Sequence, residues 1–272
     1  MLDEGMVLRF LTFLASLMLS GSSIKVYLSA LRAWFLSLGL DPPLLITPRV
    51  KLAFRALARQ QAPPSRCRPI SSSMLRSIFY SLKYSYDNLI VYTAMVLAFF
   101  GCLRAAEYCY NPRVSPPLTP QDISKINSNP PYYIINIKSS KNSLKGFKVV
   151  IGCSGQDVCA FCALSHFLSI RPHPLHLPLF IYRDGSYLTR QVFSRAIKQQ
   201  IANIGLPTEG ITPHSLRAGA ATEAALRGAS DSAIKQLGRW SSSAYQLYIR
   251  PSQPQQASVA RQLTTGWGPP PH

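Results

Sequence analysis

Acidic residues are scarce in this chain of 272 residues, which has 11 Asp and Glu against 29 Lys and Arg and a formal net charge of +18. The sequence offers no carboxylate cluster that could hold catalytic metal ions, which argues against a metal-dependent nuclease. A solvated basic surface or an anionic membrane would fit the charge. The deficit of acids is as marked as the excess of bases, however, and this favours double-stranded DNA or another nucleic acid as the partner.

Long apolar runs are also missing. The longest, residues 89–103, is shorter than the roughly 20 residues that cross a bilayer, and it predicts a fully buried helix. The first residues, Met-Leu-Asp-Glu-Gly, lack the basic start of a signal peptide. We therefore expect a soluble intracellular protein with no membrane partner.

Cysteine is too sparse for a disulfide framework, with six in a chain of this size. Cys153, Cys159, Cys162 and His166 have a loosely metal-like spacing. Small apolar residues would fit the same helical positions, and buried thiols are common. We interpret these cysteines as buried thiols and expect no bound metal.

Proline marks the organisation of the chain. Residues 61–69 are polar, basic and Pro-rich, as in a linker. This predicts a small helical domain at 1–60, the linker at 61–69, a larger domain at 70–250 and a tail at 251–272.

Hydrophobic periodicity predicts a fold that is mainly α with a small antiparallel β-sheet. We expect strands at 132–137 and 147–151. Ser22 or Ser23 is expected to cap the second helix, on which Ile24, Leu28, Leu31 and Phe35 share an apolar face. The other helices are expected at 6–18, after Pro48, near Ser73, and at 157–170, 189–204, 214–227, 231–237 and 243–250.

Cations repeat every four residues at Lys51, Arg55 and Arg59, with no acid between them, so they share one helix face. Lys25 and Arg32 lie on the preceding predicted helix. This pattern is typical of a solvated face, but the missing acids favour contact with a phosphate backbone.

The candidate catalytic residues are concentrated in the last quarter of the chain. There His214 and Arg217 lie three residues apart and so share a helix face. Arg104 and Glu107 have the same spacing. Two arginines could clamp the non-bridging oxygens of a phosphodiester, because guanidinium groups form paired bonds to phosphate and stay protonated. Cleavage would then need no metal or other cofactor.

The other catalytic roles would be filled by residues that, taken one at a time, are weak evidence for a catalytic site. His214 and Trp240 can donate N–H groups to the phosphate, and His214 can also help proton transfer. Lys141, or secondarily Lys145, could protonate the leaving oxygen from a hairpin tip that also contacts DNA. A tyrosine, Tyr245 or Tyr248, could be the nucleophile, with its pKa lowered by the adjacent arginines. Glu107 would orient the site.

The joint order Arg, Lys, His-x-x-Arg, Trp, Tyr resembles the tyrosine recombinases, or phage integrases. The phrases FFGCLRAAEY, IKSSKNSLKG and TPHSLRAGAATEAALRGASDSAIKQLGRWSSSAYQLYIR are most similar to recombinases of DIRS/Ngaro-type retrotransposons, then Cryptons. The resemblance implies a catalytic set of Arg104, Lys141, His214, Arg217, Trp240 and Tyr248, with Glu107 beside it. Residues 22–40 resemble a helix of the SAM-like core-binding domain that crosses DNA. The resemblance thus implies that 1–60 is a helical DNA-binding domain and 70–250 the catalytic recombinase domain.

The resemblance further implies DNA cleavage and rejoining through a 3′-phosphotyrosyl intermediate. A homo-tetramer on two DNA sites would carry out integration or recombination of a mobile element in the nucleus, without a cofactor. A domesticated, catalytically silent DNA-binding protein and a type IB topoisomerase are the alternatives. The separation of Trp240 from Tyr248 is slightly shorter than in the phage members, which keeps Tyr245 as a minor candidate nucleophile.

Overall fold

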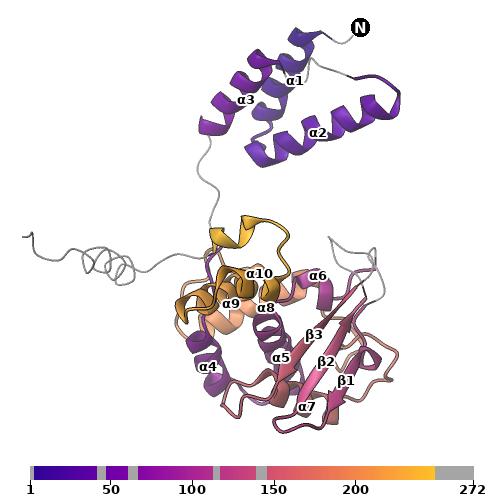
Figure 1. Cartoon of the computed structure of the whole chain (residues 1–272), viewed down its shortest axis with the longest axis vertical. Helices are drawn as coiled ribbons and strands as arrows, with labels where there is room; N and C mark the ends of the chain where they lie inside the picture. The colour runs from indigo at the N-terminus through magenta and orange to yellow at the C-terminus, as the bar shows by residue number, and fades with distance from the viewer. Residues whose placement is uncertain (1–2, 42–46, 61–66, 113–116, 139–145, 249–272) are drawn as a thin grey trace, which may run out of the picture. The chain divides into compact units, whose positions relative to one another are not determined.

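The computed structural model describes residues 3–41, 47–60, 67–112, 117–138 and 146–248. It divides into two compact units, residues 1–65 and 66–272 (Figure 1). Lys141, Lys145, Arg250 and the tail from residue 251 lie outside the described residues.

The first unit consists of three helices, α1 (Glu4–Ser16), α2 (Gly21–Ser37) and α3 (Pro48–Gln60). Their apolar faces meet in a small core formed by Val7, Leu11, Leu14, Ile24 and Val50. Leu28 and Leu31 pack against this core, in agreement with the predicted apolar face of α2.

The predicted cap of α2 is wrong. Ser20 is the N-cap residue, and its hydroxyl accepts the backbone N–H of Ser23 at 3.1 Å. The hydroxyls of Ser22 and Ser23 lie 2.8 and 2.9 Å from the Ser20 hydroxyl. With several serines close together, the sequence alone could not show which one had the extended backbone that a cap requires.

The second unit is built around α5 (Tyr86–Phe100), which is buried on all sides from Leu89 to Phe99. α4 (Ser72–Ser81), α7 (Ala160–Ile170), α8 (Arg190–Asn203) and α9 (His214–Leu226) contact it. The prediction of a buried helix in the apolar run is confirmed, although the helix ends at Phe100 and the rest of the run forms a loop. That loop leads to Arg104.

A three-stranded antiparallel sheet forms one side of the second unit, in the order β1 (Ile123–Ile126), β2 (Tyr132–Ile137), β3 (Phe147–Gly152) (Figure 1). The sequence analysis missed β1, whose four residues are too short for a clear alternating pattern. On β2, Tyr133, Ile135 and Ile137 are buried, as expected for a strand with one face on the core. Val149 of β3 pairs with Ile135.

Four short or late elements complete this unit: α6 (Ala105–Tyr108), α10 (Asp231–Gly238) and the 3-10 helices η2 (Pro120–Asp122) and η3 (Ser243–Leu247). The predicted fold class, mainly α with a small antiparallel sheet, is confirmed. The α-helix expected at 243–250 is instead a 3-10 helix that ends before Tyr248. None of the helices in the described ranges has the length and apolar character needed to span a membrane.

The segment before α4 lies against α9. The Ile70 backbone N–H donates to the Ser215 carbonyl at 3.0 Å. A Cβ on Gly219 would lie 1.8 Å from the Ile70 carbonyl oxygen, so only glycine permits this approach. The start of the second unit is thereby held against the helix that carries His214 and Arg217.

Candidate active site

Tyr248 and His214 face each other at the start of α9. The Tyr248 hydroxyl lies 2.6 Å from His214 Nε2, and the two rings meet edge to face. The Thr222 hydroxyl donates to the Tyr248 carbonyl at 2.8 Å, so α9 also holds the backbone of Tyr248. A residue separated from His214 by 34 positions is thus within proton-transfer distance.

Tyr245, the minor candidate nucleophile, is placed differently. It is 1% exposed and packs with Ile234 and Ala221. Its hydroxyl donates to Asp231 at 2.8 Å. Tyr245 thus connects η3 to the start of α10 and has the surroundings of a packing residue. Tyr248, by contrast, is part-buried beside the His214 imidazole.

Glu107 is buried between two arginines. Its carboxylate accepts the Arg104 backbone N–H at 2.8 Å and the Arg104 side chain at 3.1 Å. It also accepts Arg239 Nη2 at 3.3 Å. The Glu107 side chain is 1% exposed, while Arg104 and Arg239 are 22% and 21% exposed. Glu107 therefore fixes two cations at the edge of the site, as expected of an orienting residue.

Arg239 is the residue that the sequence analysis missed. It ends α10 in the left-handed conformation at φ 54°, and its guanidinium lies over the Phe147 ring at 4.2 Å. It donates to the carbonyls of Gly101 and Cys102 at 3.2 and 3.0 Å. The available signal was its place beside Trp240 in Leu-Gly-Arg-Trp, but αL at this position is usually taken by glycine, so sequence alone gave no reason to assign it a role.

Arg217 is the most deeply placed cation of the site, at 1% exposed. It donates to the carbonyls of Cys102 and Gly238. Because a guanidinium carries five N–H donors, these two bonds leave three for another acceptor. Both Arg217 and Arg239 thus bind the Cys102 carbonyl and fix the loop that precedes Arg104.

Trp240 covers the guanidinium of Arg217, which lies 4.3 Å from the centre of its ring. The ring also lies 6.1 Å from that of Tyr248. A Cβ on Gly238 would fall 1.7 Å from the Trp240 ring, so the glycine makes room for the indole. Trp240 therefore positions both Arg217 and Tyr248, in addition to any contact its N–H could make.

The electrostatics favour a neutral imidazole. Burial lowers the pKa of His214, and the nearby charges of Arg217, Arg104 and Arg190 lower it further. A neutral ring can accept a proton from the phenol it touches.

The expectation that the arginines depress the pKa of the nucleophile is wrong for the DNA-free protein. Burial raises the pKa of Tyr248, and Arg217 and Arg104 only partly offset this. Desolvation of a phenolate outweighs the attraction of the two cations here.

The predicted lysines, Lys141 and Lys145, lie outside the described residues. The hairpin that carries them is described up to Lys138, which pairs with Asp122 at 2.9 Å. β2 and β3 therefore place the two ends of the lysine-bearing segment, as the predicted strands implied.

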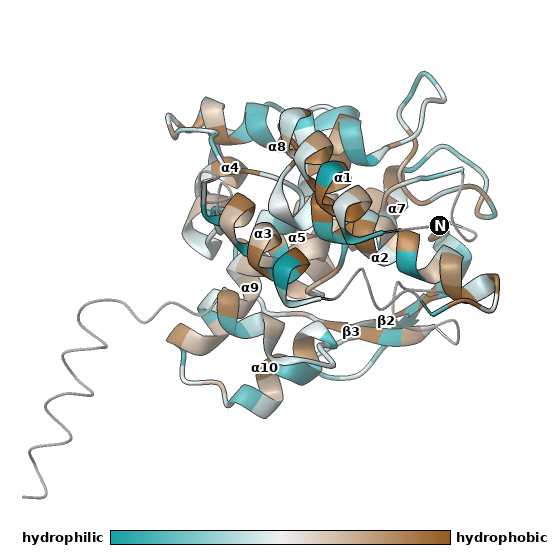
Figure 2. Cartoon of the chain, turned by 90° about the horizontal axis from the view of Figure 1, so that it is seen from above, coloured by the Kyte–Doolittle hydropathy of each residue, from teal (hydrophilic) through white to brown (hydrophobic). Residues whose placement is uncertain are grey.

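The first unit gathers part of its predicted DNA-binding set around one hollow. Lys25, Arg32 and Lys51 line a cavity of about 230 Å³ together with Leu28, Ser29, Val50 and Phe54. Arg55 and Arg59 continue along the exposed face of α3, where Figure 2 shows hydrophilic and hydrophobic segments alternating. Arg32 lies 3.9 Å from Asp41, an exposed pair that leaves the basic character of the hollow largely intact.

Solved structures similar to this chain include several DNA recombinases. The Tn1549 transposon integrase (residues 82–397) in complex with circular intermediate DNA is 15% identical, with a TM-score of 0.65, covering 96% of this chain and 85% of that one. XerH bound to palindromic difH is 16% identical, with a TM-score of 0.63, covering 95% and 69%. A lambda integrase (75–356) dimer bound to a COC′ core site is 16% identical, with a TM-score of 0.62, covering 92% and 80%.

The fold of the second unit is that of a tyrosine recombinase catalytic domain. Residues 122–253, which make up most of this unit, match the model of the phage integrase family. The family match therefore covers the part of the chain from β1 to η3, which shares the fold of these solved recombinases. No curated protein matches the sequence.

Proposed function

We propose that this protein cleaves and rejoins DNA at specific sites through a covalent 3′-phosphotyrosyl intermediate, with Tyr248 as the nucleophile. The 2.6 Å contact between the Tyr248 hydroxyl and His214 Nε2 carries the proposal. A phenol and an imidazole nitrogen that can accept its proton are thus in contact, in a site that contains three arginines.

In the cleavage step, the Tyr248 oxygen attacks the phosphorus as its proton passes to His214. The bond from phosphorus to the 5′ oxygen breaks, and Lys141 supplies the proton for that leaving oxygen. Rejoining reverses the step, with a 5′-hydroxyl from another strand displacing the tyrosine. No net oxidation or hydrolysis takes place, so the phosphodiester bond energy is kept.

The arginines stabilise the charge that grows on the non-bridging oxygens. Arg104 is partly exposed and keeps its orientation through Glu107. Arg217 contributes the N–H groups that its two backbone acceptors leave free. Arg239 acts as a positioning residue, because its bonds go to Glu107 and to the loop carbonyls.

The first unit would grip the DNA backbone through Lys25, Arg32, Lys51, Arg55 and Arg59, with Lys145 contributing from the hairpin. We further propose that the enzyme works as a homo-tetramer on two sites and serves integration or recombination of a mobile element in the nucleus. The similarity to a transposon integrase supports the mobile-element role. The sequence phrases resemble DIRS/Ngaro-type elements first and Cryptons second.

A covalent-complex assay tests the chemistry. The full chain is incubated with nicked duplex DNA bearing an element end, so that cleavage releases a short strand and traps the intermediate on a denaturing gel. We expect a protein–DNA band in the wild type and in Tyr245→Phe, and none in Tyr248→Phe. Tyr245→Phe is a matched control because it removes one hydroxyl from the adjoining 3-10 helix.

Binding is measured in parallel on the same DNA. A band that persists in Tyr248→Phe would assign the nucleophile elsewhere. Absence of any band, despite tight and site-specific binding by the wild type, would favour the domesticated DNA-binding protein. Relaxation of supercoiled DNA without dependence on a site would favour the type IB topoisomerase.

A further inference from the structure

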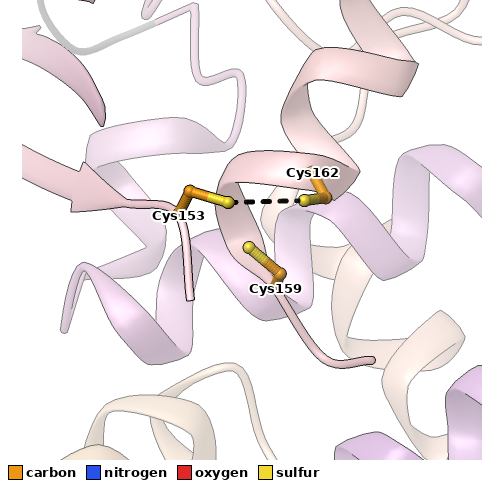
Figure 3. Close-up of side chains that lie close together, drawn as sticks. All are labelled: Cys153, Cys159 and Cys162. Carbon is orange, nitrogen blue, oxygen red and sulfur yellow. Dashed lines mark hydrogen bonds between the residues drawn. The ribbon is translucent and has the colours of Figure 1, made fainter. Parts of the chain in front are cut away.

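Three cysteine thiols converge where the end of β3 meets the start of α7 (Figure 3). Cys153 directly follows β3, Cys159 is the N-cap residue of α7, and Cys162 lies in the first turn of that helix. The Sγ atoms of Cys153 and Cys162 are 3.9 Å apart, and all three sulfurs lie within 4.8 Å of one another. The sequence interpretation of these residues as buried thiols is wrong for Cys162, which is exposed, and for Cys153, which is half-buried.

The sulfur spacing matches a shared metal ion. Tetrahedral zinc holds thiolates at about 2.3 Å, which puts neighbouring sulfurs about 3.8 Å apart. The separation of Cys153 from Cys162 is close to this value. A disulfide would require the two sulfurs to approach to about 2.05 Å. The two-residue gap between Cys159 and Cys162 is also the usual spacing of a zinc-binding pair on one turn.

The surroundings suit anionic sulfur. The Ser154 backbone N–H points at the Cys159 Sγ at 3.4 Å. Backbone donors of this kind orient and stabilise metal-bound thiolates. Cys159 and Cys162 also occupy the N-terminal end of an 11-residue helix, where the helix dipole favours negative charge. The exposure of Cys162 provides a route for an ion from solvent.

We propose that Cys153, Cys159 and Cys162 bind one zinc ion as thiolates. Each thiol releases its proton to solvent as its sulfur binds, and water takes the fourth position. The ion would fasten the end of β3 to the start of α7. This inference does not depend on the proposed strand-transfer chemistry, in which no metal takes part.

The expected consequence is structural. β3 is one leg of the hairpin that carries Lys141, and α7 packs against both β3 and α5. An ion held by all three thiols requires β3 and α7 to be together, so it binds the folded state in preference to the unfolded one. Binding of this kind raises thermal stability as the ion concentration rises above its dissociation constant.

Metal content and affinity test the proposal on the full chain. The protein is reduced, stripped with a chelator and titrated with Co²⁺ followed by Zn²⁺, and stoichiometry is read by native mass spectrometry. We expect one ion per chain and the intense visible absorption of tetrahedral Co²⁺–thiolate. Cys153→Ser, Cys159→Ser and Cys162→Ser should each bind more than about tenfold more weakly, since even losing a residue that only orients a ligand costs about that much.

Cys67→Ser is the matched control. Cys67 is also a half-buried free thiol, but it contacts Thr212 and Ser215 and lies outside the cluster. This variant should keep wild-type affinity and the zinc-dependent rise in Tm. Equal affinity in Cys67→Ser and in the cluster variants, or no bound ion in the wild type, would overturn the proposal.

A measurement on the wild type alone guards against variants that fail to fold. Thiol alkylation followed by peptide mass spectrometry should show Cys153, Cys159 and Cys162 protected by zinc, with Cys67 reacting at the same rate with and without the ion. Alkylation of the three cluster cysteines at the same rate with and without zinc would instead reject the metal site.

Discussion

Glu107→Gln is the sharpest test of how the site is held together. The carboxylate is 1% exposed and accepts hydrogen bonds from the Arg104 backbone, the Arg104 side chain and Arg239. Glutamine keeps the shape and one amide oxygen, but it loses the negative charge and puts an NH₂ group against two cations.

The magnitude follows from this burial. Removing one partner of a buried ion pair costs about 3–5 kcal/mol because the other charge stays desolvated. Arg104 and Arg239 are each about one-fifth exposed, and water can partly solvate them. We therefore expect a loss of about 2–4 kcal/mol in the free energy of unfolding of the second unit.

Urea unfolding, followed by far-UV circular dichroism and by tryptophan fluorescence, measures the loss. The control is Arg227→Gln, which breaks a Glu223–Arg227 pair whose arginine is 73% exposed and should cost less than about 1 kcal/mol. A loss in Glu107→Gln no larger than in the control would refute the argument that Glu107 neutralises two part-buried cations. In the covalent-complex assay, Glu107→Gln should also slow cleavage under conditions where it remains folded.

Three other perturbations test separate parts of the structure. Because burial and three arginines lower the pKa of His214, its ring should titrate below 6.5 in an NMR pH series of the DNA-free protein. The stability that His214 contributes should be complete above its unfolded pKa of about 6.5 and should fall as the pH drops toward its pKa in the folded protein. Titration of the ring at or above pH 6.5 would contradict a neutral base. Gly238→Ala drives a Cβ into Trp240 and should cost about 1–3 kcal/mol in unfolding free energy and impair cleavage. Gly152→Ala, with nothing within 4 Å of its added Cβ, should leave cleavage unchanged, and equal effects of the two would dismiss the Gly238–Trp240 contact. Replacing Lys51, Arg55 and Arg59 together by glutamine should weaken DNA binding. It should also reduce the slope of log affinity against log salt by about 0.9 for each phosphate that these cations neutralise. An unchanged slope would make this face of α3 an ordinary solvated surface.

The sequence by itself determined which residues are candidates for catalysis and where the main helices and strands lie. The long apolar run located the core helix α5, and runs rich in β-branched and aromatic residues located β2 and β3. The spacing of His214 and Arg217 put both on one helix face, since that relation is local. These features depend on residues only a few positions apart, so they can be inferred directly from the sequence.

Tertiary structure decided everything that depends on distant segments meeting. The pairing of Glu107 with Arg239, the different partners of Tyr245 and Tyr248, and the raised pKa of Tyr248 all depend on burial and on contacts between segments far apart in the chain. The convergence of Cys153 with Cys159 and Cys162 likewise requires β3 to end beside the first turn of α7. Desolvation and ion pairing act through space, so spacing along the chain could not tell which of these residues would touch.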